Sequence, residues 1–392
     1  MIKLKTIKEI KELKGKRVLL RVDFNVPLDE NGNIRDSFRI EKSLPTIKYL
    51  KRKKAKVILI THLGKPKGRK VEKLRLNNVQ KKLSSYLDFK IKKLDDCIGE
   101  KVERKIKKMK EGDIILLENL RFHKGEENND KNFTRLLAKL GDIYVNDAFS
   151  VCHRPHSSIV GLPYYLPAFS GFLLEKEVEV LTHISEKAKK PLVVIIGGAK
   201  VSSKITTINL FLKKGGIILI GGKVANIILG VRNDLKLRGK SLEKEAGVAK
   251  KIKLEEGKVY LPLDVVVKRR KNNSICIKNL SADKIKNINL IFDIGDQTIE
   301  LFSKIIKKGR TIIWAGPLGL FEDSLFEKGT KIIGREIVKN KNAFKFAGGG
   351  DTSLALLKFG LRERFDFVST GGGAMLAFLG GEKLPGLEIL KK

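Results

Sequence analysis

The stretch "PLVVIIGGAKVSSKI", residues 191–205, shows the pattern that decides the fold. A continuous apolar run rich in Val and Ile ends in two glycines and leads into a segment with helical spacing. Continuous rather than alternating apolar residues indicate a strand buried on both faces of a parallel sheet. Glycine lets the backbone approach a ligand closely, and the first N–H groups of a helix favour an anion. The stretch therefore predicts a strand–turn–helix unit with an anion site at its turn.

The same pattern recurs along the chain, with helical stretches such as 201–213 and 324–340 between the apolar runs. Repeated units of this kind indicate an α/β protein with parallel sheets. Since 392 residues exceed one ordinary core, two domains are expected. The other runs are "RVLLRVDF" (17–24), "KVILITHL" (56–63), "DIILLEN" (113–119), "DIYVND" (142–147), "GIILIGG" (216–222), "LIFDIG" (290–295), "TIIWAG" (311–316), "FKFAGGG" (344–350) and "FDFVST" (365–370).

The two halves place different residues at their strand ends, where ligands of open α/β sheets bind. A loop broken by prolines, 161–171, separates them and precedes a helical segment that serves as connector. The second half supplies mostly glycine, as in "AGGGDTS" and "STGGGA", which suits the phosphates of a nucleotide. The first half suits a small, multiply charged acid, because it supplies Arg21, Asp23, Asn25, His62, Arg121 and Asp147.

Several of these residues allow two interpretations. Asp351 in "GGDTSLAL" can cap a helix or bind Mg²⁺, and Thr352 beside it offers a hydroxyl to phosphate. Lys200 and Lys204 lie four apart on one helix face, which is either a solvated face or part of an anion site. Asp23 fits hydroxyl and cation recognition, although a structural salt bridge is an equal alternative.

Histidines and arginines of the first half together predict an anion pocket, because arginine donates paired hydrogen bonds to carboxylate and phosphate. A single histidine of this kind would more often be structural. The residues concerned are His62, His123, His153, His156, Arg39, Arg121 and Arg154.

Composition bounds the remaining possibilities. The net charge of +37 attracts nucleic acids, membranes and small anions alike, but the lysines are dispersed and aromatic residues make up only 7%. A basic nucleic-acid-binding α/β protein is the alternative function, and a basic stripe on one face would favour it. An oxidoreductase is disfavoured because no GxGxxG opens a helix. Three separated cysteines argue against disulfides and zinc, and with no long apolar run or leader core we expect a cytoplasmic protein with no membrane contact.

Nine ordered motifs make the chain resemble the phosphoglycerate kinase family along nearly its whole length. The resemblance implies two doubly wound parallel-sheet (Rossmann-like) domains joined by a hinge helix. It also implies reversible phosphoryl transfer between 1,3-bisphosphoglycerate and MgADP, giving 3-phosphoglycerate and MgATP. The transfer would be in line and would follow hinge closure. We expect a monomer without a specific nucleic-acid partner. The motifs are "RVDFNVP", "FRIEKSLPTI", "THLGKP", "LLENLRF", "VNDAFSVCHRPHSS", "GGAKVSSKI", "WAGPLGLFE", "GGGDTS" and "VSTGGGAML" followed by "LPGLEIL".

The same resemblance assigns domains and roles. It implies a 3-phosphoglycerate domain at 1–170, a connecting helix at 171–187, a nucleotide domain at 188–375 and a tail, 376–392, that packs back on the first domain. The catalytic group would be Arg39, Lys200, Gly371, Gly372 and Gly373. The acid would be bound by Arg21, Asp23, Asn25, Arg39, His62, Lys65, Arg121 and Arg154. The nucleotide would be bound by Gly198, Lys200, Lys204, Gly319, Glu322, Gly350, Asp351 and Thr352, with Asp351 also holding Mg²⁺.

Three positions depart from the family pattern. Lys65 replaces an arginine, Ala315 replaces an asparagine, and Asp296 stands where a proline is usual, at an expected helix start. None of these changes removes a group on which the chemistry depends.

Overall fold

The computed structural model describes residues 2–87, 89–199, 201–202, 204–252, 257–271 and 274–392. Two compact units make up the chain: Met1–Thr182 with Lys383–Lys392 (unit 1), and His183–Glu382 (unit 2). Their boundary falls inside helix α6 (Phe172–Lys187). Residues 376–382, expected in the tail, belong to unit 2, where Thr207 Oγ1 donates a hydrogen bond to the carbonyl of Leu376 (3.0 Å).

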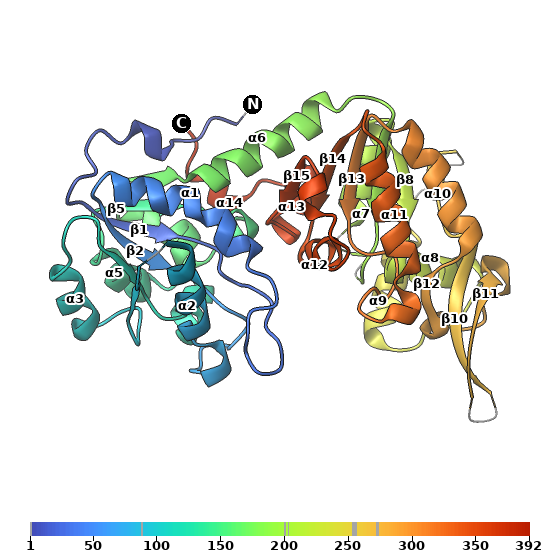
Figure 1. Cartoon of the computed structure of the whole chain (residues 1–392), viewed down its shortest axis with the longest axis horizontal. Helices are drawn as coiled ribbons and strands as arrows, with labels where there is room; N and C mark the ends of the chain where they lie inside the picture. Colours follow the sequence, from blue (N-terminus) through green and yellow to red (C-terminus); the bar gives the residue numbers. More distant parts are fainter. Residues whose placement is uncertain (1, 88, 200, 203, 253–256, 272–273) are drawn as a thin grey trace. The chain divides into compact units, whose positions relative to one another are not determined.

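Unit 1, which begins with the blue and teal segments in Figure 1, contains a six-stranded sheet. Every pairing in this sheet is parallel. Both chain ends belong to this unit, since Leu4 and Lys391 form an antiparallel bridge. The strand order is β3 (Lys92–Lys93), β4 (Ile114–Leu116), β2 (Lys56–Ile60), β1 (Arg17–Arg21), β5 (Ile143–Asn146) and β6 (Ala168–Ser170). The helices are α1 (Phe38–Arg52), α2 (Asn77–Leu87), α3 (Glu100–Lys107), α4 (Lys124–Glu127), α5 (Lys131–Ala138) and α14 (Pro385–Glu388).

Both faces of this sheet are buried, as the continuous apolar runs predicted. In β1, Val18 and Leu20 belong to one hydrophobic cluster, whereas Leu19 between them belongs to another on the opposite face. In β2, Val57 and Ile58 are divided in the same way. Since successive side chains of a strand point to opposite faces, the inner positions of these central strands are apolar on both sides.

Unit 2 contains a second six-stranded parallel sheet, so the prediction of two parallel α/β domains is confirmed. Trp314 of its central strand β13 is fully buried. The strand order is β15 (Phe367–Ser369), β14 (Phe344–Gly348), β13 (Thr311–Ala315), β7 (Leu192–Ile196), β8 (Ile217–Ile220) and β9 (Val259–Tyr260). The helices are α7 (Ile205–Lys213), α8 (Gly222–Arg232), α9 (Lys240–Ala249), α10 (Asp296–Lys308), α11 (Lys328–Lys339), α12 (Gly350–Lys358) and α13 (Gly373–Leu379).

A small antiparallel sheet in unit 2 was not predicted. Its order is β11 (Ser274–Ser281), β10 (Asp264–Lys271) and β12 (Ile291–Ile294). The run "LIFDIG", expected in the parallel sheet, forms β12 and pairs antiparallel with β10. The apolar run indicated burial correctly, but a short run carries no information on the direction of its partner.

Buried aspartates fix the first turns of helices to the sheets. Asp264 accepts hydrogen bonds from the backbone N–H groups of Gln297 (3.2 Å) and Thr298 (2.9 Å) in α10. Asp293 accepts one from Gly329 in α11 (2.7 Å). Asp147 accepts two at the start of α6, and burial raises its pKa to about 6. The aspartate at the end of "DIYVND", expected among the ligand groups, therefore anchors a helix.

No helix in the described part of the chain is long and apolar enough to cross a membrane.

Asp293 should make the stability of unit 2 depend on pH. Burial raises the pKa of this carboxyl to about 7, so the native state keeps a proton that the unfolded chain releases near pH 4. The contribution of Asp293 to the free energy of unfolding is therefore full below about pH 4 and falls as pH rises toward 7. A difference of three pKa units corresponds to about 4 kcal/mol as an upper limit.

Urea unfolding of the wild type and Asp293→Asn at pH 5 and pH 8 measures this effect. In Asp293→Asn, the free energy of unfolding should no longer show the decrease between pH 5 and pH 8 that Asp293 causes. Glu363→Gln, a control at an exposed residue of unit 2, should keep that decrease. Equal slopes for Asp293→Asn and the wild type would contradict the assignment.

Candidate active site

Two buried polar residues at neighbouring strand ends form the centre of the site in unit 1. Arg21 is the last residue of β1, and His62 lies two residues beyond β2. Arg21 Nη2 donates to His62 Nδ1 (3.0 Å), and Arg21 Nε donates to Ser158 Oγ (2.9 Å). Because Nδ1 accepts a hydrogen bond, the His62 ring is neutral in this arrangement.

Asp23 orients Arg39, which comes from the first turn of α1. Arg39 Nη1 lies 2.5 Å from Asp23 Oδ2 and 3.1 Å from the backbone carbonyl of Asn25. Ser150 Oγ also donates to Asp23. Asp23 therefore forms the structural salt bridge that was one of its two predicted roles. The Arg39 side chain is 21% exposed and accessible to a ligand.

The backbone at Gly64 connects two further predicted residues. Its N–H donates to Asn25 Oδ1 (2.8 Å), and its carbonyl accepts from Arg121 Nη1 (2.7 Å). Asn25 and Arg121 thus hold the "THLGKP" loop. Lys65, the next residue in that loop, is exposed.

The arginines, and not the histidines, carry the positive charge of this pocket. Burial lowers the pKa of His62 well below its ordinary value, and the charges of Arg21, Arg121 and Arg39 lower it further. Burial also lowers the pKa of His156 to about 3, with Arg121, Arg21 and Arg154 adding to the effect. Charged guanidinium groups beside neutral rings are an arrangement that suits an anionic ligand.

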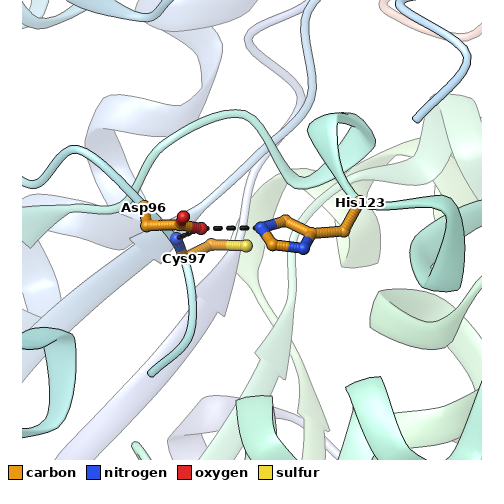
Figure 2. A group of neighbouring side chains, drawn as sticks. All are labelled: Asp96, Cys97 and His123. Atoms are coloured by element: carbon orange, nitrogen blue, oxygen red, sulfur yellow. Dashed lines mark hydrogen bonds and ion pairs between the residues drawn. The ribbon is translucent and has the colours of Figure 1, made fainter. Parts of the chain in front are cut away.

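The other two histidines have different surroundings. His153 Nε2 accepts a hydrogen bond from Arg154 Nε (3.2 Å), and burial lowers the pKa of this histidine. His123, expected in the anion pocket, instead forms a 2.6 Å hydrogen bond with Asp96 (Figure 2).

Sequence reasoning missed the residues that hold the pocket in place. Ser158 Oγ donates to the fully buried Glu126 (2.6 Å) and accepts from Arg21, and Ser150 supports Asp23. Ser150 and Ser158 lie in the "VNDAFSVCHRPHSS" motif and Glu126 lies four residues after "LLENLRF", but serines and a glutamate at such positions carry no distinct signal. Only their burial against arginines reveals the role.

Glycine turns in unit 2 pack backbone against backbone at the strand ends. A Cβ atom on Gly316 would lie 2.4 Å from the carbonyl oxygen of Gly197, so no side chain fits there. Gly198 has φ +77° and donates its N–H to the carbonyl of Pro317 (2.8 Å). The β7 and β13 turns therefore present backbone groups where side chains would otherwise block access.

Lys204 is a buried cation at this edge. Its Nζ donates to the carbonyl of Gly197 (2.5 Å) at the start of α7. Burial lowers the pKa of Lys204 to about 8, and the carboxylates of Asp351 and Glu245 oppose that effect. The Asp351 side chain itself is exposed, in the first turn of α12. A buried lysine near an exposed carboxylate fits a site for phosphate with a metal ion.

The turn at 371–373 lies beside the turn that precedes α12. A Cβ atom on Gly372 would be 3.7 Å from the Cα of Gly349, an ordinary contact. Gly371 donates its N–H to Ser369 Oγ (3.1 Å), and α13 begins at Gly373. The first N–H groups of that helix have no partner within it.

The hydroxyl of Thr352, which the resemblance assigns to the nucleotide, has two backbone partners. Its hydroxyl accepts from the N–H of Gly316 (2.8 Å) and donates to the carbonyl of Gly348 (2.9 Å), and the side chain is fully buried. The hydroxyl therefore ties two strand-end turns together, and its proton is not directed at a phosphate.

The remaining predicted positions vary in their surroundings. Gly319 donates to Thr330 Oγ1 (3.2 Å), Gly350 opens α12 and Glu322 is exposed. Ala315 is buried. Asp296 begins α10 as expected, and its Oδ1 lies 2.5 Å from Lys328 Nζ. Lys200 lies outside the described residues.

Comparisons with known proteins agree with this geometry. A family model described as phosphoglycerate kinase matches residues 7–382. The chain is 48% identical over 396 residues to a phosphoglycerate kinase of Dictyoglomus turgidum, with 99% of each chain covered. It is 44% identical over 401 residues to one of Aquifex aeolicus, covering 100% of this chain and 99% of the relative.

Solved structures give the same result. The phosphoglycerate kinase of Pyrococcus horikoshii matches with a TM-score of 0.85 and 30% identity, over 99% of this chain and 98% of that one. The enzyme of Coxiella burnetii matches with a TM-score of 0.78 and 34% identity, over 99% of both chains.

Thr352→Val should destabilise unit 2 and leave direct nucleotide contacts intact. It removes a hydroxyl with two buried backbone partners, at a cost of about 1–3 kcal/mol. Thr352→Ser keeps the hydroxyl and should recover most of this loss. Thermal unfolding and calorimetry with ADP distinguish the two roles, since a direct phosphate ligand would lower ADP affinity without lowering the melting temperature.

Proposed function

Because the chain belongs to the phosphoglycerate kinase family, we propose that its two units divide the reactants of that reaction between them. The reaction is reversible phosphoryl transfer between 1,3-bisphosphoglycerate and ADP, giving 3-phosphoglycerate and ATP, with a carboxyl group as acceptor. Unit 1 binds the acid and unit 2 binds the nucleotide. The observation that carries this division is the set of arginines around the neutral, buried His62, which suits an acid with a carboxylate and a phosphate.

In unit 1, the arginines bind the two anionic groups of 3-phosphoglycerate. Arg39 has its Nη1 fixed by Asp23 and Asn25, so its guanidinium is oriented before the ligand arrives. We assign to Arg39 the stabilisation of the phosphoryl group in transfer, because Asp23 orients it and its side chain is partly exposed. Lys65, exposed in its loop, adds charge at the rim.

In unit 2, Lys204 and the glycine turns bind the phosphates of the nucleotide. The exposed carboxylate of Asp351 fits Mg²⁺, which prefers oxygen ligands and is commonly held by one or two carboxylates. When bound, the ion would neutralise charge on the nucleotide phosphates. Glu322 is assigned to the ribose hydroxyls, and Lys200 keeps its assignment as a phosphoryl ligand on sequence grounds alone.

This division needs no general base. The attacking group is a carboxylate or a nucleotide phosphate, both already ionised, so the protein has to position the reactants and neutralise charge on the transferring group. The 371–373 turn does this by bringing backbone N–H groups close to that group. Since acid and nucleotide bind to different units, we propose that one chain completes in-line transfer after closing about α6.

Arg39→Ala should lower kcat by about a hundredfold, because a donor that acts on transition-state charge is worth about 3 kcal/mol. Binding of 3-phosphoglycerate should weaken less. A coupled ATP assay gives kcat, and calorimetry gives the affinity for the acid. Arg35→Ala, an exposed arginine just before α1, is the control and should keep full activity. Loss of acid affinity with kcat retained would assign Arg39 to ground-state binding.

Gly372→Ala should keep the fold but slow transfer by up to about a hundredfold. The added Cβ meets only the Cα of Gly349 at 3.7 Å, and φ at this position is −104°, so alanine is structurally tolerated. Gly247→Ala in α9, where a Cβ meets nothing within 4 Å, is the matched control. Wild-type kcat in Gly372→Ala, at an unchanged melting temperature, would refute a role for this turn at the phosphoryl group.

A further inference from the structure

A cluster of three potential metal ligands lies in unit 1 and takes no part in the proposed transfer. Asp96 and Cys97 come from the segment between β3 and α3, and His123 immediately precedes α4. Figure 2 shows the three side chains pointing toward one another. A carboxylate oxygen, a sulfur and a ring nitrogen all lie within 4.8 Å of one another, and no other such group was found among the described residues.

The cluster is ordered by its own contacts. Asp96 Oδ1 accepts from His123 Nε2 (2.6 Å) and from the backbone N–H of Cys97 (2.8 Å). The His123 ring packs beside Phe133, with ring centroids 5.4 Å apart. The side chains of Asp96 and His123 are 33% and 27% exposed, whereas Cys97 is fully buried. An ion arriving from solvent would therefore first contact the Asp96 oxygen and the His123 nitrogen, and the buried Cys97 sulfur would lie behind them.

We propose that Asp96, Cys97 and His123 form a binding site for a thiophilic divalent cation of the Zn²⁺ type. Thiolate, imidazole and carboxylate are the ligands Zn²⁺ takes in proteins, and three of them leave a fourth, open position for water. Mg²⁺ is the wrong ion for this set because it prefers oxygen ligands. The site is therefore chemically distinct from the magnesium position assigned to Asp351.

The distances fit such an ion after a small rearrangement. Ligands about 2.0–2.3 Å from a common ion can be up to about 4 Å apart. The Asp96–His123 pair has to open, and the sulfur, which lies within 4.8 Å of the oxygen and the nitrogen, has to move closer to both. As the metal bonds form, the Cys97 thiol gives its proton to solvent, and the His123 proton leaves Nε2 for Nδ1 so that Nε2 can coordinate.

Two further features define how the site would behave. Burial raises the pKa of the Cys97 thiol well above its ordinary value, which makes it a poor nucleophile without a metal. Lys70 Nζ lies 3.2 Å from Asp96 Oδ2 and so places a competing positive charge at the carboxylate. Removing that lysine should tighten metal binding, an effect that damage to the fold would not produce.

Titration of the full-length, metal-free protein with Co²⁺ tests the proposal. A bound Co²⁺ should give a sulfur-to-metal charge-transfer band and the intense visible bands of a four-coordinate ion, and Zn²⁺ should displace it. Cys97→Ser should abolish the charge-transfer band, while Cys276→Ser, which changes an exposed cysteine, should keep it. His123→Asn should weaken Zn²⁺ binding by at least about tenfold. Lys70→Met should tighten it several-fold.

Three outcomes would overturn the proposal. The first is a Co²⁺ spectrum without a thiolate band, and the second is a band that survives in Cys97→Ser. The third is Zn²⁺ affinity unchanged in both His123→Asn and Lys70→Met, two substitutions at partly exposed side chains that keep the test valid if Cys97→Ser does not fold. Kinase activity does not enter this test, so its result is independent of the function proposed above.

Discussion

Burial of parallel strands on both faces is the constraint on which the rest of this structure depends. In β1, Val18 and Leu20 pack on one side and Leu19 on the other, so no polar side chain fits within the strand. The first position free for chemistry is its carboxyl end, at Arg21. Because neighbouring parallel strands end at the same edge, His62 after β2 meets Arg21 there.

The electrostatic properties of that edge of the sheet arise because several arginines are buried close together there. Arg21 and Arg121 are almost fully buried, and His62 is kept neutral first by its own burial and then by the charges of Arg21, Arg121 and Arg39, which together lower its pKa. The burial of these cations is partly offset by Asp23 and Glu126, which are buried as well. Arg121 also pairs with Glu127 (3.3 Å), and an anionic ligand would supply further compensation for the arginines.

In unit 2 the strands are buried in the same way, but backbone groups of glycine turns occupy the strand ends in place of charged side chains. Gly197 and Gly316 approach so closely that a Cβ on the latter would collide with the carbonyl of the former, and Thr352 ties the Gly316 turn to the end of β14 at Gly348. Buried aspartates such as Asp293 hold the neighbouring helices at fixed positions. These contacts fix the backbone of the turns that, with Lys204, we propose as the phosphate site.

The sequence by itself determined the parallel strands, the glycine turns and the arginines at the strand ends of unit 1, because continuous apolar runs and strand-end residues are local signals. It also indicated the family through nine ordered motifs. Only the tertiary structure decided contacts between residues distant in the chain. It showed that β12 pairs antiparallel with β10, that the Thr352 hydroxyl is occupied by backbone, and that Asp147 anchors a helix.

The metal-ligand cluster illustrates the same limit most clearly. Cysteine spacing alone argued against zinc, since no second cysteine lies near Cys97. The approach of His123 to Asp96, 27 residues apart in sequence, brings nitrogen, oxygen and sulfur together. Spacing along a chain cannot reveal such a meeting, because it is produced by the packing of the loop after β3 against the turn before α4.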